Sequence, residues 1–374
     1  MRIYLDNAAT TPLSNEVIDA MIPFLRQNFG NPSSTHQEGR TAKAAIEKTR
    51  KVVAKAIHAI TPEIIFTSGG TEANNMAIKC AVRDLGVNRI ISSPIEHSCV
   101  FNTVNRMGGE AIKIEYVKLD DCGKANLEHL KELLADQSYT TLVSLMHANN
   151  EVGTLNPIAK IGDLCANYQA YFHTDTVQTI GHLPIDVRTM NINFLSGSGH
   201  KLHGPKGVGF LYVNKKNLIE AYIDGGGQER QMRSGTENVA SIVGLGQALQ
   251  GAIDQLDERK AHIEEVRNYF VAQLQAHFPT AHFNGDYAGD CLFTVLNVAF
   301  QTKLPVSMLL FKLDLNGISA SGGSACNSGA VSKSRVLNQL PITDEYQSVR
   351  FSFSHYNTKE EIDKTIATLQ KILL

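Results

Sequence analysis

The chain has no run of apolar residues long enough to cross a membrane. A transmembrane helix needs about 20 consecutive apolar residues, and no segment of this sequence approaches that length. The first residues, MRIYLD, also lack the apolar centre of a signal peptide. These two absences argue against a membrane protein and predict a protein that stays in the cytoplasm.

An excess of positive charge is missing too. The sequence has 35 lysines and arginines against 37 aspartates and glutamates, which gives a formal net charge of -2 at pH 7. Proteins that bind nucleic acid present a basic face to the phosphate backbone. The balance of charges therefore argues against a nucleic-acid partner.

Paired cysteines are absent as well. The six cysteines are Cys80, Cys99, Cys122, Cys165, Cys291 and Cys326. No two of them form a C-x-x-C pair, so neither a zinc site nor a disulfide framework is expected. Most of them read as small buried side chains in a reducing compartment.

The sequence does contain the pattern of an α/β protein. Short apolar segments typical of strands occupy residues 63–67, 89–92, 111–117, 140–145, 170–174, 192–195 and 208–213. Helical patterns at 71–85 and 157–168 separate some of them. We predict a mostly parallel seven-stranded sheet sandwiched by helices, with the last two strands close enough to be antiparallel. The polar segment 30–40 reads as a loop.

The character of the chain changes after the glycines at 225–227. Helices are expected at 237–256, 258–277, 305–313 and 359–373, and strands at 292–298 and 348–352. Because 374 residues exceed the usual size of one core, we expect two domains. The large one covers 13–250, and a smaller α+β one covers 251–374 together with an N-terminal arm, 1–12.

Lys201 is the most informative residue. It follows Ser198, Gly199 and His200 after the apolar segment 192–195, while Asp175 follows the segment 170–174. A desolvated lysine amine loses its proton and becomes a nucleophile. An acid can pair with a protonated pyridine nitrogen. A lysine and an acid at neighbouring strand ends indicate a Schiff-base site for pyridoxal 5'-phosphate (PLP).

Other polar residues follow strands at the same expected edge of the sheet. Gly70 and Thr71 open a helix and favour an anion site, although a simple helix-capping turn has the same pattern. His97 could stack on a flat ligand or could only begin a helix. Asn150 could bind a ring hydroxyl or could only form a turn.

Nucleotide-binding motifs are incomplete around Lys201. The segment 197–202 starts like a dinucleotide fingerprint but lacks its third glycine, and Pro205-Lys206 replaces the end of a P-loop. Lys206 lies farther from the strand end than Lys201. We therefore rank both a nucleotide site and Lys206 below the Schiff-base lysine.

Three further residues stand in notable surroundings. Cys326 lies in SGGSACNSG (321–329), a run of small residues typical of a mobile, exposed loop, in which a thiol is accessible. Arg350, on the strand 348–352, could clamp a substrate carboxylate or form an interface ion pair. Thr236 could cap the following helix or reach a phosphate across a subunit interface.

Taken together, the motifs resemble those of the cysteine desulfurases of the NifS/IscS type, within the class V, fold-type I PLP enzymes. They run in family order along nearly the whole chain: YLDNAATTP (4–12), FGNPSS (29–34), FTSGGTEANN (66–75), EH (96–97), NNEVG (149–153), HTDTVQ (173–178), SGHKLHGPKG (198–207), RSGTEN (233–238), SGGSACNSG (321–329) and VRFSFS (349–354).

The resemblance implies a role for each matching residue. Lys201 would hold PLP covalently and move protons at the substrate Cα, and Cys326, on a mobile loop at 321–332, would take the sulfur of L-cysteine as a persulfide and leave L-alanine. The implied cofactor site is Gly70, Thr71, His97, Asn150, Asp175, Gln178, Ser198, His200, Lys201 and Thr236, the last donated by the other subunit of a homodimer. Arg350, Asn31 and Asn150 would bind the substrate.

The family pattern also leaves alternatives open. The sulfur acceptor could be an iron–sulfur scaffold or another sulfur carrier protein, and a selenocysteine lyase or another class V carbon–sulfur lyase or aminotransferase shares most of the motifs. A desulfurase-like scaffold without turnover is disfavoured by the intact set of Lys201, Asp175, His97 and Cys326. Asn327 and His355 depart from the residues usual in the family.

Overall fold

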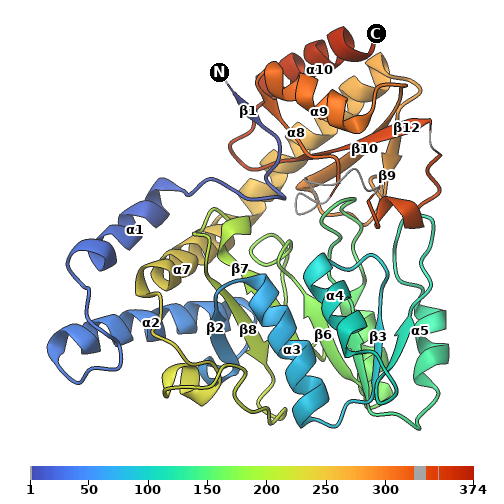
Figure 1. Cartoon of the computed structure of the whole chain (residues 1–374). Helices are drawn as coiled ribbons and strands as arrows, with labels where there is room; N and C mark the ends of the chain where they lie inside the picture. Colours follow the sequence, from blue (N-terminus) through green and yellow to red (C-terminus); the bar gives the residue numbers. More distant parts are fainter. Residues whose placement is uncertain (1, 324–333, 344) are drawn as a thin grey trace.

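The computed structural model describes residues 2–323, 334–343 and 345–374. It has two lobes, one above the other in Figure 1. The larger lobe is built on a seven-stranded sheet and the smaller on a three-stranded one. Within the described residues, no helix is both long and apolar enough to span a bilayer.

The large sheet has the strand order β2-β8-β7-β6-β5-β3-β4. Its strands are β2 (Ile64–Thr67), β3 (Arg89–Ser92), β4 (Lys113–Tyr116), β5 (Thr141–Ser144), β6 (Tyr171–Asp175), β7 (Phe194–Ser198) and β8 (Gly209–Val213). The strands from β7 through β4 run parallel, and β8 is antiparallel to both β7 and β2. This confirms the predicted α/β fold class and the antiparallel pairing of the last two predicted strands, β7 and β8.

Helices cover both faces of this sheet, so its strands are apolar on both sides. Along β5, Leu142 packs in the core under α3 and α4, whereas Val143 packs in the core on the opposite face. The helices of the large lobe are α1 (Asn15–Arg26), α2 (Gln37–Ala56), α3 (Gly70–Asp84), α4 (Ser98–Met107), α5 (Leu127–Leu134), α6 (Ile158–Asn167) and α7 (Val239–Asp254). Short 3-10 turns are η1 (Thr61–Glu63), η2 (Gly199–Lys201), η3 (Gln228–Gln231) and η5 (Leu337–Gln339).

The predicted loop at 30–40 is wrong at its end. Helix α2 already begins at Gln37, after His36, whose ring accepts a hydrogen bond from the backbone N–H of Gly39. The segment reads as polar because most of its side chains face solvent. Within α2 the first buried residues are Gly39 and Ala42, so the apolar signal of the helix starts late.

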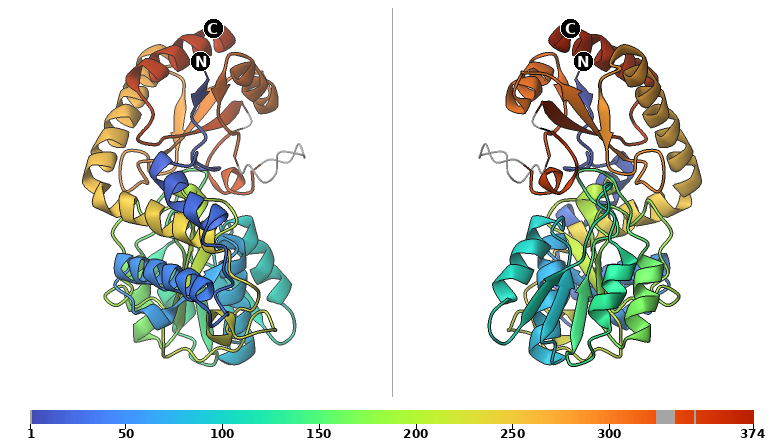
Figure 2. Two further views of the ribbon diagram at one scale, coloured as in Figure 1. Left: turned by 90° about the vertical axis from the view of Figure 1, so that its left-hand side faces the viewer. Right: turned by 90° about the vertical axis from the view of Figure 1, so that its right-hand side faces the viewer.

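The small lobe has the sheet order β12-β10-β9, entirely antiparallel. Its elements are β9 (His282–Asn284), β10 (Val295–Gln301), β12 (Tyr346–Ser352), α8 (Leu256–His277), α9 (Val306–Leu315) and α10 (Lys359–Leu373). Figure 2 shows α8 rising from the end of α7 along one side of the molecule into this lobe. Phe270 of α8 packs edge-on against Phe351 of β12 in a core separate from that of the large lobe.

The N-terminal segment joins the two lobes. Strand β1 (Ile3–Tyr4) pairs in parallel with β11 (Ile318–Ser319), and Leu5 is buried in the core of the small lobe. A few residues later the chain reaches the large lobe, where the backbone N–H of Thr11 donates to the carbonyl of His200. This crossing places residues 6–10 beside the turn that carries Lys201.

Candidate active site

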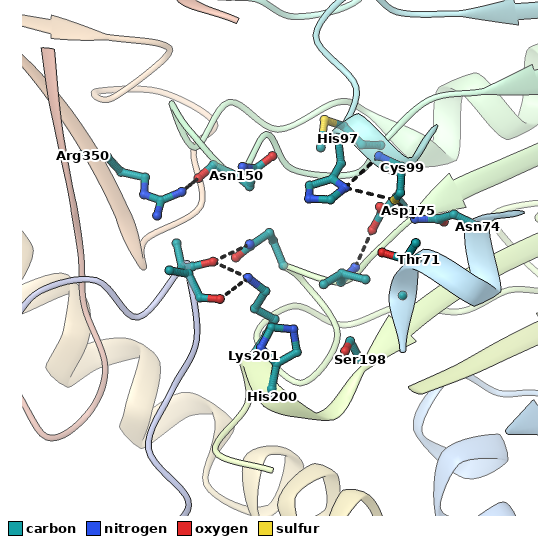
Figure 3. A pocket seen from close by; sticks show the side chains of 16 residues that line it. Thr71, Asn74, His97, Cys99, Asn150, Asp175, Ser198, His200, Lys201 and Arg350 are labelled. Carbon is teal, nitrogen blue, oxygen red and sulfur yellow. Dashed lines mark hydrogen bonds between the residues drawn. The ribbon is translucent and has the colours of Figure 1, made fainter. Parts of the chain in front are cut away.

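A cavity of about 190 Å³ lies at the carboxyl ends of the parallel strands, as expected for an open α/β sheet. Figure 3 shows the side chains that line it. Ten predicted residues line this one cavity: Gly70, Thr71, His97, Asn150, Asp175, Gln178, Ser198, His200, Lys201 and Arg350.

The glycines before α3 shape one end of the cavity. Gly69 has a φ of +154°, a backbone conformation that side chains disfavour. A Cβ on Gly70 would lie 2.6 Å from the side chain of Val177, so only glycine lets the chain pass here. The first N–H groups of α3 lack partners within the helix. They therefore open toward the space beside Thr71 and Ser198, as anion sites at helix N-termini do.

A more open hollow adjoins the cavity at this end. Gly70, Thr71, Ser198 and His200 line both spaces. Burial, together with the charges of Lys201 and Lys206, lowers the pKa of His200 to about 4, so its imidazole is neutral at pH 7. Two hydroxyls, a neutral imidazole and a helix N-terminus form a donor set suited to a phosphate group.

Lys201 ends the short turn η2 and reaches across to the N-terminal segment. Its Nζ donates to the backbone carbonyls of Ala8 at 2.5 Å and Ala9 at 2.7 Å. Gln178 donates to the same carbonyl of Ala8 at 3.1 Å. The amine is thereby held inside the cavity, on the side opposite His97 in Figure 3.

Asp175 is the last residue of β6 and is 6% exposed. Its Oδ1 accepts from the backbone N–H of Val177 at 2.9 Å, and its Oδ2 accepts from the side-chain amide of Asn74 at 2.6 Å. Both oxygens are therefore fixed, and the carboxylate faces the cavity from the sheet edge.

His97 both begins a helix and lines the cavity. As the residue before α4, it accepts a hydrogen bond from the backbone N–H of Cys99 at its Nδ1, 3.2 Å away. The Sγ of Cys99 lies 3.0 Å from the same nitrogen. The capping role and the predicted ligand-facing role are thus compatible, because capping uses only one edge of the ring.

Arg350 is buried, with 1% of its surface exposed. One terminal nitrogen donates to Asp6 Oδ1 and the other to the backbone carbonyl of Asn150, both at 2.8 Å. Its Nε has no hydrogen-bond partner among the described residues. The guanidinium therefore forms the interface ion pair that the sequence offered as an alternative, and it keeps N–H groups that could bind a carboxylate.

Two predicted residues lie elsewhere. Asn31 is exposed and accepts a hydrogen bond from the backbone N–H of Ser33, and it does not line the cavity. Thr236 is also exposed and lines a different hollow, near Arg233 and Glu237. Cys326 falls outside the described residues.

Six lining residues were missed from the sequence: Ala8, Ala9, Asn74, Cys99, Met146 and Val177. Asn74 sits inside a helix and Cys99 just inside another, where neither pattern nor spacing marks a ligand-facing side chain. The two alanines act through their carbonyls, which every residue carries. The matching segments YLDNAATTP, FTSGGTEANN and HTDTVQ contain four of these six residues and were the available signal.

Known proteins resemble this chain over nearly its whole length. The family model for aminotransferase class-V matches residues 3–365. The cysteine desulfurase IscS of Dictyoglomus turgidum is 43% identical over 375 residues, 99% of this chain and 94% of that protein. The cysteine desulfurase IscS of Methanosarcina thermophila is 43% identical over 376 residues, 99% of this chain and 92% of that protein.

Solved structures are similar over the same length. A NifS-like protein has a TM-score of 0.92 at 36% identity, covering 100% of this chain and 99% of that one. The structure of SspA in complex with cysteine has a TM-score of 0.81 at 32% identity, covering 96% of this chain and 100% of that one. The chain therefore belongs to the aminotransferase class-V family and, within it, to the cysteine desulfurases of the IscS and NifS type.

Proposed function

We propose that this protein is a PLP-dependent cysteine desulfurase. It would convert L-cysteine to L-alanine and carry the released sulfur on Cys326 as a persulfide. The observation that carries the proposal is the convergence of Lys201, Asp175 and His97 with the Gly70–Thr71 turn on one cavity. These residues come from distant parts of the sequence, and family membership supports the same reading.

The residues present fit PLP. The anion site at the start of α3 has the donors that a phosphate needs, and Gly70 leaves room for close approach of the backbone. Lys201 offers an amine within the cavity, and Asp175 offers a fixed carboxylate. When bound, PLP supplies an aldehyde that reacts with amines and a ring that withdraws electrons from the substrate Cα.

The proposed roles follow from where each side chain lies. Lys201 would attach the cofactor and then move a proton at the substrate Cα, since its amine lies inside the cavity. Asp175 would keep the pyridine nitrogen protonated. His97, which lies across the cavity from Lys201, would stack on the cofactor ring. Gln178 would bond the ring hydroxyl, and Gly70, Thr71, Ser198 and His200 would hold the phosphate.

Arg350 and Asn150 would bind the substrate carboxylate at the small-lobe side of the cavity. Asn31 and Thr236 lie outside the cavity of their own chain, so their proposed roles require the other subunit of a homodimer. Helix α1 and its flanks support such a dimer, because apolar side chains are exposed there at Leu25 (65%) and Phe29 (78%).

Cys326 would attack the sulfur of the bound substrate as a thiolate. A sulfur–sulfur bond would form while the substrate Cβ–Sγ bond breaks. The electron pair of that bond would pass to Cβ, which would take up a proton, and the carbon skeleton would leave as alanine. The persulfide would then pass its sulfur to an acceptor protein, such as an iron–sulfur scaffold or a sulfur carrier. We propose a cytoplasmic location for this transfer.

The test is mass spectrometry of the PLP-loaded protein after L-cysteine is added without reductant. We expect one additional sulfur on the peptide that contains Cys326, and alanine in the supernatant. With a thiol reductant, alanine and sulfide should form repeatedly.

Cys326→Ser is the discriminating variant. It should bind PLP as the unaltered protein does but form no alanine from cysteine. Undiminished alanine formation by this variant would instead assign a lyase that eliminates sulfur directly. If the unaltered PLP-loaded protein forms no alanine, the proposed reaction is wrong.

A further inference from the structure

The side chain of Asn74 lies at the centre of a polar cluster beneath the candidate cofactor site. It is 1% exposed and lines the cavity from α3. Its Nδ2 lies 2.6 Å from Asp175 Oδ2 and 3.3 Å from Cys99 Sγ. Its Oδ1 lies 2.5 Å from Ser196 Oγ and 3.0 Å from His173 Nε2. Two donor hydrogens and two acceptor lone pairs are thus all engaged, which fixes the amide in one orientation.

That orientation follows from the chemistry of the neighbours. The carboxylate of Asp175 can only accept hydrogen bonds, so the NH₂ group of Asn74 must face it. The oxygen of Asn74 then faces His173, whose Nε2 must carry a proton. Burial lowers the pKa of His173 to about 3, so the ring is neutral and its Nδ1 accepts from the Ser144 hydroxyl at 2.8 Å. Each hydrogen bond in the chain from Ser144 through His173 and Asn74 to Asp175 therefore has one donor and one acceptor.

A second branch runs from Asn74 to His97. The other amide hydrogen of Asn74 points to Cys99 Sγ, which leaves the thiol hydrogen free to donate to His97 Nδ1 at 3.0 Å. The backbone N–H of Cys99 donates to the same nitrogen. Since a backbone N–H can only donate, Nδ1 is an acceptor and the ring proton of His97 sits on Nε2.

We propose that Asn74 is a positioning residue that orients both side chains meant to contact the cofactor ring, Asp175 directly and His97 through Cys99. This inference rests on the proposed PLP site. In that site, Asp175 would pair with the ring nitrogen and His97 would contact the ring. One amide sets the plane of the carboxylate and, through the thiol of Cys99, the orientation of the imidazole.

The experiment compares Asn74→Asp with Asn75→Asp. Both changes add one negative charge to adjacent positions of α3. Asn75, however, points away from Asp175, donating to the carbonyl of Thr71 and accepting from Thr103. Asn74→Asp replaces the NH₂ group that faces Asp175 by a carboxylate oxygen. The carboxylate of Asp175 then loses a hydrogen bond and is repelled by the new negative charge.

The readout is PLP binding to apoprotein, followed by absorbance and by the circular dichroism of the bound cofactor. We expect Asn74→Asp to raise the dissociation constant about tenfold or more. Asn75→Asp should stay within about twofold of the unaltered protein. Cys99→Ala interrupts only the His97 branch, so it should keep the PLP affinity and change the dichroism of the bound cofactor.

The outcomes separate this inference from the proposed function. If the unaltered protein binds no PLP, the proposed cofactor is wrong, and the inference fails with it. If it binds PLP and Asn74→Asp binds as tightly as Asn75→Asp, only the role of Asn74 is overturned. Should Asn74→Asp not fold, Asn74→Ser is judged by the same tenfold limit. If neither folds, Asn74 serves stability rather than positioning.

Discussion

Two groups of buried charges in this molecule differ in how completely they are paired. Beneath the start of β2, Arg50 meets Glu229 through two hydrogen bonds of 2.6 and 2.8 Å. The Nε of Arg50 donates to Glu47, and one of its terminal nitrogens also donates to the carbonyl of Ile64. Glu229 accepts a further hydrogen bond from the backbone N–H of Phe66. Every charged group there has its partners.

Around the cavity the pairing is incomplete. Arg350 leaves its Nε without a partner, and Glu96, beside His97, leaves its Oε2 without one, both among the described residues. Buried polar groups are rarely left unsatisfied unless a ligand or a function uses them. The contrast indicates that Arg50 and Glu229 hold the fold together, whereas Arg350 keeps an N–H group for a ligand in the cavity.

The largest expected effect comes from breaking the complete pair. Arg50→Met leaves the carboxylate of Glu229 buried without its cation and should lower the free energy of unfolding by about 3–5 kcal/mol. Urea denaturation measures this loss. The double change Arg50→Met/Glu229→Gln removes the unpaired charge and should restore part of the stability. A single variant as stable as the unaltered protein would show that the pairing is dispensable.

Glu96 should give the protein a pH-dependent stability. Burial raises the pKa of its carboxyl to about 8, far above its ordinary 4.5. The folded state therefore retains a proton that the unfolded chain releases, and the contribution to stability falls as pH rises from about 4.5 to 8. Between pH 5.5 and 7.5 we expect a loss of about 2–3 kcal/mol. Glu96→Gln should lack this slope in unfolding measured across that range, and equal slopes would contradict the assignment.

Arg350→Lys tests the cavity side of the comparison. Lysine keeps the positive charge but cannot bind Asp6, the carbonyl of Asn150 and a substrate carboxylate with one planar group. We expect kcat/KM for L-cysteine to fall about 30- to 100-fold, equivalent to about 2–3 kcal/mol. The affinity for PLP should change less than about twofold. A larger effect on PLP than on cysteine would assign Arg350 to the cofactor.

The smallest expected change in stability comes from the exposed ion pair of Lys359 and Glu265. Both side chains are about half exposed, at 45% and 63%, although their charged atoms lie only 2.6 Å apart. Solvent screens such a pair, so Lys359→Ala should change the free energy of unfolding by no more than about 0.5 kcal/mol. A loss comparable to that of Arg50→Met would mean that distance, rather than burial, decides the strength of ion pairs in this protein.

Much of the large lobe could be predicted from the sequence, because buried parallel strands are continuous apolar segments. The strand at 89–92 and the closing helix at 359–373 have the predicted bounds. Helices whose buried side is narrow gave no such signal: α1 was not foreseen, and the first residues of α2 read as a loop. Strand β10 lies three residues later than predicted, at Val295–Gln301.

Of the candidate site, the residues that follow strands were predictable and those that depend on distant contacts were not. Asp175 stands directly after an apolar segment and Lys201 shortly after another, where the chain order itself places them at the sheet edge. Asn74 matters through Asp175, 101 positions away in the sequence, and through Cys99, 25 positions away. The ion pair between Arg350 and Asp6 spans 344 positions and has no local signature.

The crossing of the N-terminal segment also sets an order of events during synthesis. Residues 3 and 4 leave the ribosome first, yet their strand partner is Ile318–Ser319. Asp6 similarly waits for Arg350, and the backbone N–H of Asn7 for the carbonyl of Ser352. Because domains fold as they emerge, the large sheet can form while these residues are still unpaired. The carbonyls that hold Lys201 are then fixed only near the end of translation, so a truncated chain could fold its sheet without acquiring a finished cavity.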